Sequence, residues 1–127
     1  MKYHKKHHEM ITEIANRLIY AGYQVKVNYL LKPRYQIKGE IDVLSVDIDS
    51  KILGLVEVKT HYSIKNYNKA REQLKREDKL LRNYYGFNSF VIAKFYYSNE
   101  FKEAYGNKRA RKALEGIIFK ESFRKKS

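Results

Sequence analysis

Two consecutive stretches of sequence decide the fold: GEIDVLSVD at positions 39–47 and ILGLVEVKT at positions 52–60. Both are rich in the aliphatic and β-branched residues that favour strands, and the Asp and Ser residues at 47–51 favour a turn. We therefore predict two strands, at about 40–48 and 52–60, that form an antiparallel hairpin. Apolar residues occupy both faces of each strand, which is typical of central strands covered on both sides.

Three charged residues, Asp42, Glu57 and Lys59, interrupt these apolar strands. A hairpin with this turn places Asp42 opposite position 56, so Asp42 and Glu57 are expected to be diagonal neighbours. Two carboxylates at that distance repel each other unless a divalent cation lies between them, and oxygen ligands suit Mg²⁺. Lys59 could activate a water molecule or stabilise charge on a phosphoryl group. The alternative interpretation is a structural set of salt bridges at the end of a sheet.

Further helices and strands are expected to surround this hairpin. Apolar residues at helical spacing predict helices, and aromatic or β-branched runs predict strands. The expected helices are at 5–21, 64–84 and 99–115, and the further strands are at 23–31 and 87–97. The resulting order, αβββαβα, indicates an α/β fold with a mixed central β-sheet flanked by helices, in a single domain over residues 1–127.

The net charge favours a polyanionic partner. The chain has 27 Lys and Arg against 14 Asp and Glu, a formal charge of +13, and residues 60–127 hold 17 of the basic residues but 7 of the acidic ones. Such a field attracts nucleic acid first. The residues expected to bind phosphates are Lys65, Lys69, Arg71, Lys75, Arg76, Lys108, Arg109, Arg111 and Lys112.

Several classes of protein are disfavoured. Without cysteine, the chain has no disulfides, thiolate zinc sites or thiol nucleophiles. No apolar run approaches the roughly 20 residues of a membrane span, and no apolar segment follows the basic N-terminus. We therefore expect an intracellular, cytoplasmic protein that does not bind membranes. His4, His7 and His8 are loosely spaced, which favours contact with phosphate or solvent over a metal site.

The order of the charged residues resembles the PD-(D/E)XK nuclease superfamily: Asp42 is followed 15 residues later by Glu57-Val58-Lys59 on the next strand, behind a helix. The sequence motifs GEIDV and VEVKT are similar to those of archaeal Holliday junction resolvases and related small nucleases. The resemblance covers roughly residues 9–97. The resemblance implies a restriction-endonuclease-like core and phosphodiester hydrolysis that depends on Mg²⁺ or Mn²⁺. It also implies that Asp42, Glu57 and the Val58 carbonyl bind the metal, and that Lys59 assists the water.

The resemblance implies two further site residues on helices. Members of the superfamily often have a Glu on the first helix; Glu9 and Glu13 are the candidates here, and Glu13 is preferred. Some members carry a Gln on the helix after the Glu-X-Lys strand. Gln73 would be the corresponding residue here. The aromatic residue that often follows one turn later is replaced by Glu77.

The predicted function is therefore a Mg²⁺-dependent DNA endonuclease that recognises branched or single-stranded regions rather than a defined sequence. A resolvase of this kind would be a homodimer, for which the aromatic strand at 87–97 is the candidate interface. The alternative is a non-catalytic nucleic-acid-binding protein on the same fold, in which the charged triad is structural.

Overall fold

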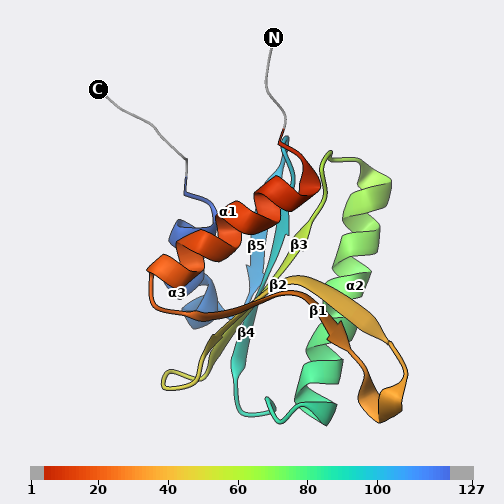
Figure 1. Cartoon of the computed structure of the whole chain (residues 1–127), viewed down its shortest axis with the longest axis vertical. Coiled ribbons are helices and arrows are strands. Elements are labelled where there is room, and N and C mark those ends of the chain that lie inside the picture. The colour runs from red at the N-terminus through yellow and green to blue at the C-terminus, as the bar shows by residue number, and fades with distance from the viewer. Residues whose placement is uncertain (1–4, 121–127) are drawn as a thin grey trace.

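The computed structural model describes residues 5–120 and has a mixed α/β fold, as predicted (Figure 1). Its elements are α1 (His7–Tyr20), β1 (Gln24–Leu31), the short 3₁₀ helix η1 (Pro33–Tyr35), β2 (Gly39–Asp47), β3 (Ile52–Val58), α2 (Ile64–Tyr84), β4 (Val91–Tyr97), β5 (Lys102–Gly106) and α3 (Lys108–Ile118). No helix in this described part of the chain is long and apolar enough to cross a membrane.

The five strands form one mixed sheet in the order β1-β2-β3-β4-β5. The strands β3 and β4 are parallel, and the other neighbours are antiparallel. The helices α1 and α3 cover one face of this sheet, and α2 covers the other (Figure 1). The two central strands are therefore covered on both sides, which explains their apolar sequence.

Each helix packs on the sheet through a stripe of residues three or four positions apart. In α1 the stripe includes Met10, Ile14 and Leu18. In α2 the buried positions are Ala70, Leu74, Glu77 and Leu81. Such spacing keeps side chains on one face of a helix. The stripe of α2 is exceptional because one of its members, Glu77, is an acid.

The hairpin of β2 and β3 forms as predicted, but its register differs by one residue. Val43 pairs with Val56 and Leu44 with Leu55, across a turn in which Lys51 adopts a φ of +56°. Continued by one pair, this register sets Asp42 directly opposite Glu57, on the face of the sheet that α2 covers. The ladder itself ends at Val43 and Val56, so Asp42 and Glu57 lie on the same face of the sheet just beyond the last backbone pair, close enough for the charge of Asp42 to raise the pKa of Glu57.

The segment predicted as a helix at 99–115 contains a strand before its helix. β5 pairs antiparallel with β4, and α3 begins only at Lys108. The chain turns between them because Gly106 adopts a φ of +98°, and the Asn107 side chain caps α3 by accepting a hydrogen bond from the Ala110 amide at 3.0 Å. The order is therefore αβββαββα.

The strand predicted at 87–97 is shorter and lies inside the sheet. It begins at Val91 and runs between β3 and β5, and its residues Phe95, Tyr96 and Tyr97 are buried. This strand does not provide the surface that we expected for a homodimer, because its backbone is paired on both edges and its aromatic side chains form the core.

Candidate active site

Asp42 lies at a fork where β2 separates from β3. Beyond the pair of Val43 and Val56 the backbone ladder stops, and the Val58 amide donates instead to Asp42 Oδ2 at 2.8 Å. On the other side of β2, Asn28 of β1 adopts a φ of +48°, a conformation that Asn tolerates better than most residues. The β1–β2 hairpin then continues past the sheet alongside α2 (Figure 1). The fork fixes the Asp42 side chain at the end of β3, with only 8% of the residue exposed.

Glu57 and Lys59 project from the end of β3 toward the same side. Lys59 Nζ lies 3.5 Å from Glu57 Oε2, and the Lys59 backbone amide donates to the Tyr97 carbonyl at 2.9 Å. Glu57 is 3% exposed, and its Oε1 is buried with no hydrogen-bond partner among residues 5–120. Such an atom is costly to bury, so a ligand that could satisfy it is favoured.

Burial raises the pKa of both carboxyl groups. It raises the pKa of Glu57 to about 8, with a further increase from the charge of Asp42 and an opposing effect of Lys59. The pKa of Asp42 is also raised by burial, although the hydrogen bond from Val58 and the nearby His7 lower it. The pair therefore resists carrying two negative charges unless a cation compensates them.

Glu77 of α2 is a third buried carboxyl group at this site, and the sequence analysis gave it no role. It has no exposed surface, and neither carboxylate oxygen makes a hydrogen bond of good geometry within the described residues. Its pKa is raised to about 9, mainly by burial and also by the charges of Glu57 and Asp42. The predicted residue Gln73, one turn earlier, interacts with Glu77 and lowers this pKa. The available signal was an acid in an otherwise apolar helical stripe.

The residue of α1 that reaches the carboxylates is His7. Its Nε2 lies 3.0 Å from the Val58 carbonyl oxygen and 3.6 Å from Asp42 Oδ2. This contact spans 51 positions of the chain, so the spacing of the three N-terminal histidines could not reveal it. Its neighbour His8 lines the groove between α1 and β1 together with His7, and His4 lies outside the described residues.

The predicted acids of α1 do not reach Asp42. Glu13 forms ion pairs with Lys5 at 2.6 Å and with Arg17 at 3.4 Å. Glu9 accepts a hydrogen bond from the Lys6 amide at 2.9 Å, and so caps its own helix. Since Glu13 is six residues after His7, it points to a different side of α1. This corrects the prediction that Glu13 lies beside Asp42 and Glu57.

Among the residues of α2 that were predicted to bind phosphates, four are exposed and Arg71 is partly covered by neighbouring side chains. Lys65, Lys69, Lys75 and Arg76 are exposed. Arg71 instead pairs with Glu103 at 3.2 Å, and its guanidinium lies 3.8 Å from the ring centre of Tyr105. The predicted phosphate contact of Arg71 is therefore unfavourable, because these partners already hold its charge.

The basic residues of α3 lie apart from the carboxylates. This helix covers the face of the sheet opposite α2. Arg109 donates to the Ser50 carbonyl at 3.1 Å, in the turn at the far end of β2 and β3. Arg111 donates to the Gly106 carbonyl at 3.2 Å. Thus the structure does not bring Lys108, Arg109, Arg111 and Lys112 to the site that the residues of α2 border.

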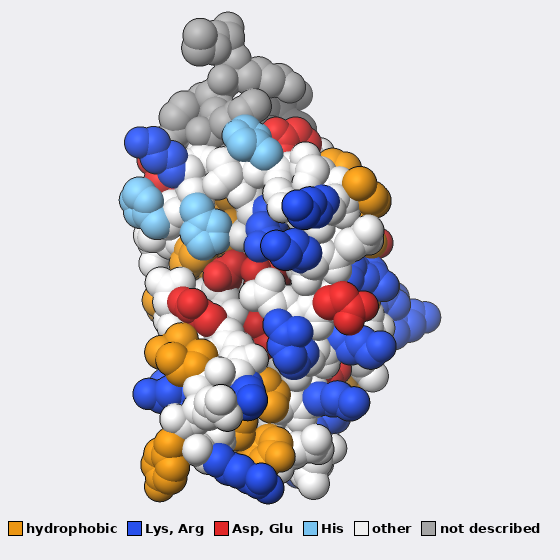
Figure 2. All heavy atoms as spheres, turned by 90° about the vertical axis from the view of Figure 1, so that its right-hand side faces the viewer, with side chains coloured by type: hydrophobic (Ala, Val, Ile, Leu, Met, Phe, Trp, Pro, Cys, Tyr) orange, Lys and Arg blue, Asp and Glu red, His pale blue; other side chains and the backbone are white. Residues whose placement is uncertain are grey.

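The face of the molecule that carries α2 shows how charge surrounds the site (Figure 2). Acidic side chains gather near its middle, histidines lie to their upper left, and Lys and Arg side chains border them above and to the right. Within residues 5–120, no three His, Asp or Glu side chains are arranged to hold a metal ion. The donors that do converge are two side chains, Asp42 and His7, and the Val58 carbonyl.

Comparison with known proteins finds similarity to solved structures only. No protein-family model matches the chain, and no curated protein is similar to it. A crystal structure of a protein of unknown function, AF1548, matches with a TM-score of 0.48 and 16% sequence identity, over 85% of this chain. This chain spans about half, 54%, of the length of that protein. The match assigns no activity.

Proposed function

We propose that this protein is a DNA endonuclease of the PD-(D/E)XK type, with a restriction-endonuclease-like core and a requirement for Mg²⁺ or Mn²⁺. The observation that carries this proposal is the pair of almost fully buried carboxylates, Asp42 and Glu57, beside Lys59 at the ends of two neighbouring strands. Two adjacent buried carboxylates are unfavourable in themselves, and functional sites are where proteins keep such groups.

The donor set suits a hard divalent cation. Asp42, Glu57 and the Val58 carbonyl offer oxygen ligands, and Glu57 Oε1 has no other hydrogen-bond partner in the described chain. These three residues would hold the ion. When bound, such an ion polarises the phosphodiester and lowers the pKa of a water molecule.

The remaining residues supply charge and position. Lys59 would stabilise negative charge on the phosphoryl group while water adds to phosphorus and one P–O ester bond breaks, leaving a phosphate monoester and a free hydroxyl. Four exposed basic residues of α2 would bind flanking phosphates: Lys65, Lys69, Lys75 and Arg76. Phosphate contacts alone carry no base sequence, so the enzyme would select DNA by its structure.

Nicking of supercoiled and four-way-branched DNA with Mg²⁺ or Mn²⁺ tests the proposal. We expect wild-type protein to cleave, and Asp42→Asn and Glu57→Gln to lose activity by at least about 100-fold. Asp49→Asn is the matched control, because Asp49 is an exposed acid in the turn at the far end of the same hairpin.

Two results would overturn the proposal in different ways. Cleavage by Asp42→Asn and Glu57→Gln at the wild-type rate would place the active site elsewhere. Binding of DNA by the wild type without cleavage under any of these conditions would favour the non-catalytic nucleic-acid-binding protein.

A further inference from the structure

We propose that His7 is a ligand of the cation at Asp42, and that its nitrogen makes this site prefer Mn²⁺ and similar transition-metal ions over Mg²⁺. The inference rests on the proposed function only for the presence of a cation at Asp42. It concerns a residue outside the predicted ligand set, which contained only oxygen donors.

The first support is the convergence of three donors at one point. The Nε2 atom of His7 lies 3.0 Å from the Val58 carbonyl oxygen and 3.6 Å from Asp42 Oδ2. Neighbouring ligands of a six-coordinate ion of this size, each about 2.1–2.2 Å from the metal, are roughly 3 Å apart. The distances from His7 Nε2 to the other two donors are therefore close to the spacing between two ligands of a shared ion.

The second support is that the protein holds the start of α1 in this place. Asn99 follows β4, and its side chain accepts a hydrogen bond from the Lys5 amide at 3.1 Å and donates to the Lys5 carbonyl at 2.9 Å. It also donates to the Thr60 carbonyl at 2.8 Å, just beyond β3. We name these three hydrogen bonds the Asn99 clamp. The clamp ties the residues before His7 to the strand end that carries Glu57 and Lys59.

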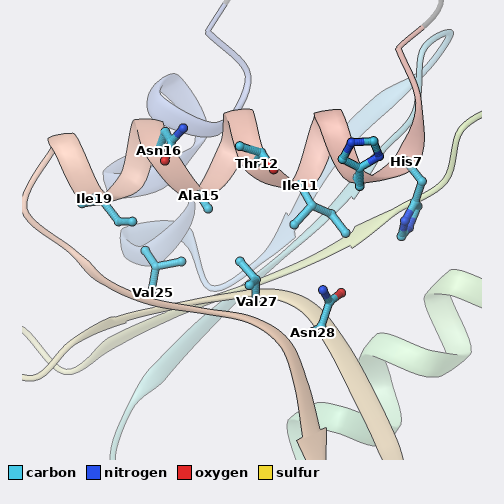
Figure 3. A pocket seen from close by; sticks show the side chains of 10 residues that line it. His7, Ile11, Thr12, Ala15, Asn16, Ile19, Val25, Val27 and Asn28 are labelled. Atoms are coloured by element: carbon cyan, nitrogen blue, oxygen red, sulfur yellow. The ribbon is translucent and has the colours of Figure 1, made fainter.

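The third support is that His7 can be reached. Figure 3 shows His7 at one end of a groove of about 390 Å³ between α1 and β1, with its side chain extending from the start of α1 toward the sheet. Its side chain is 47% exposed. An ion can therefore approach the ring from solvent.

The preference follows from the chemistry of imidazole. Mg²⁺ is best satisfied by oxygen ligands and water, and it gains little from a nitrogen donor. Imidazole is a ligand of first-row transition-metal ions, whose affinities for one site increase from Mn²⁺ toward Cu²⁺, so Mn²⁺ is the weakest test of a preference for these ions over Mg²⁺. One nitrogen beside two carboxylates should therefore shift the order of affinities without excluding Mg²⁺.

Direct binding of metal to the full chain tests this inference without any nuclease assay. We would titrate the protein with MnCl₂ or MgCl₂, measuring heat by calorimetry and free Mn²⁺ by electron paramagnetic resonance. We expect wild-type protein to bind Mn²⁺ at least about tenfold more tightly than Mg²⁺. His7→Gln should lose about tenfold in Mn²⁺ affinity and change less than about twofold for Mg²⁺.

Three further variants make the result specific. His8→Gln is the matched control, because His8 is the next residue and does not contact Asp42 in any described interaction. His7→Glu restores a charged oxygen donor, so we expect its Mg²⁺ affinity to exceed that of the wild type. Asp42→Asn should lose affinity for both ions. Circular dichroism would confirm that each variant is folded.

The outcomes separate this inference from the proposed function. Wild-type Mn²⁺ affinity in folded His7→Gln, or no preference for Mn²⁺ in the wild type, would overturn the role of His7. Unchanged binding in Asp42→Asn would overturn the site itself. Metal binding that depends on both residues, in a protein that cleaves no DNA, would leave His7 as a ligand and contradict only the nuclease.

Discussion

At the residue scale, the most unusual feature of this protein is a set of three buried acids. Asp42, Glu57 and Glu77 come from two strands and a helix, and each has a raised pKa because burial disfavours its charge. A fold under selection for stability alone would place apolar residues here. The three acids therefore make the strongest functional signal in the molecule, and they also make its stability depend on pH.

Glu77→Gln should remove part of this pH dependence. Burial raises the pKa of Glu77 to about 9 in the folded protein, whereas in the unfolded chain the pKa is near the ordinary value of 4.5, so stability falls as the pH rises between these values. Gln stays neutral throughout. We expect the variant to be more stable than the wild type by roughly 1–3 kcal/mol near pH 9 and by little near pH 5.

Urea unfolding at pH 5, 7 and 9 would measure this difference. Glu72→Gln, an exposed acid on the same helix, is the control and should follow the wild type at every pH. Parallel stability curves for wild type and Glu77→Gln would show that Glu77 is already charged in the folded protein.

Asp42 should affect stability and activity separately. Its Oδ2 accepts the Val58 amide hydrogen in place of a missing ladder bond, and an amide oxygen can accept the same hydrogen. Asp42→Asn should therefore remain within about 1 kcal/mol of the wild type, whereas Asp42→Ala leaves a buried donor unpaired and should lose about 1–3 kcal/mol. Chemical unfolding of both variants checks this, and equal losses would mean that the hydrogen bond does not hold the fork.

Only some of these residues could be predicted from the sequence. Asp42, Glu57 and Lys59 stood out because charges in apolar strands need partners. Glu77 was less conspicuous, since one acid in a helical stripe usually lies at the edge of the stripe and is solvated. His7 could not be found, because its contact depends on how α1 crosses the sheet and not on local spacing.

At the scale of elements, the first two helices, the edge strand β1 and the central hairpin were predictable, whereas the edge strand β5 was not, and the third helix was predicted to begin too early. The strong periodicity of α2 gave its bounds as 64–84, which agree with the structure. The register of β2 and β3 was missed by one residue, because it depends on the number of residues in the turn. β5 was missed because it is short, half-exposed and rich in charge, so its composition resembled that of the basic helix that follows it.

Arg71 joins α2 to the edge strand β5. Its guanidinium lies 3.8 Å from the ring centre of Tyr105 and pairs with Glu103, which also accepts a hydrogen bond from the Tyr67 hydroxyl at 2.6 Å. Arg71→Ala should lower the free energy of unfolding by about 1–2 kcal/mol, because the stacking and the ion pair are both lost.

Thermal unfolding would measure that loss, with Lys75→Ala, one turn further along the same helix, as the exposed control. DNA affinity should change little in folded Arg71→Ala. A large loss of DNA affinity with no loss of stability would show that Arg71 does bind phosphate.

At the scale of the whole molecule, the positive charge of residues 60–127 does not form one continuous field. The fold sends α2 and α3 to opposite faces of the sheet, and the carboxylates lie on the α2 side. The sequence showed that the second half is basic, but it could not show this division, which follows from the strand order.

DNA binding should therefore depend on one helix only. Replacing Lys69 and Arg76 together with Ala should weaken binding and reduce the slope of log K against log salt by about 1–2, since each lost phosphate contact removes about 0.9. The matched double variant, Lys108→Ala with Lys112→Ala, removes the same charge from α3 and should keep the wild-type slope. Fluorescence anisotropy over a range of KCl concentrations measures both, and equal losses would mean that DNA contacts both faces.

The Asn99 clamp affects when the parts of the site can come together during synthesis of the chain. Lys5 and Asn99 are 94 positions apart, so a chain emerging from the ribosome carries Asp42 and Glu57 well before His7 can be fixed beside them. Contacts between distant parts of a chain form late, after loop closure has been paid for by other interactions. Completion of the site is thereby coupled to synthesis of nearly the whole domain, and a product truncated before Asn99 would lack the hydrogen bonds that fix the start of α1.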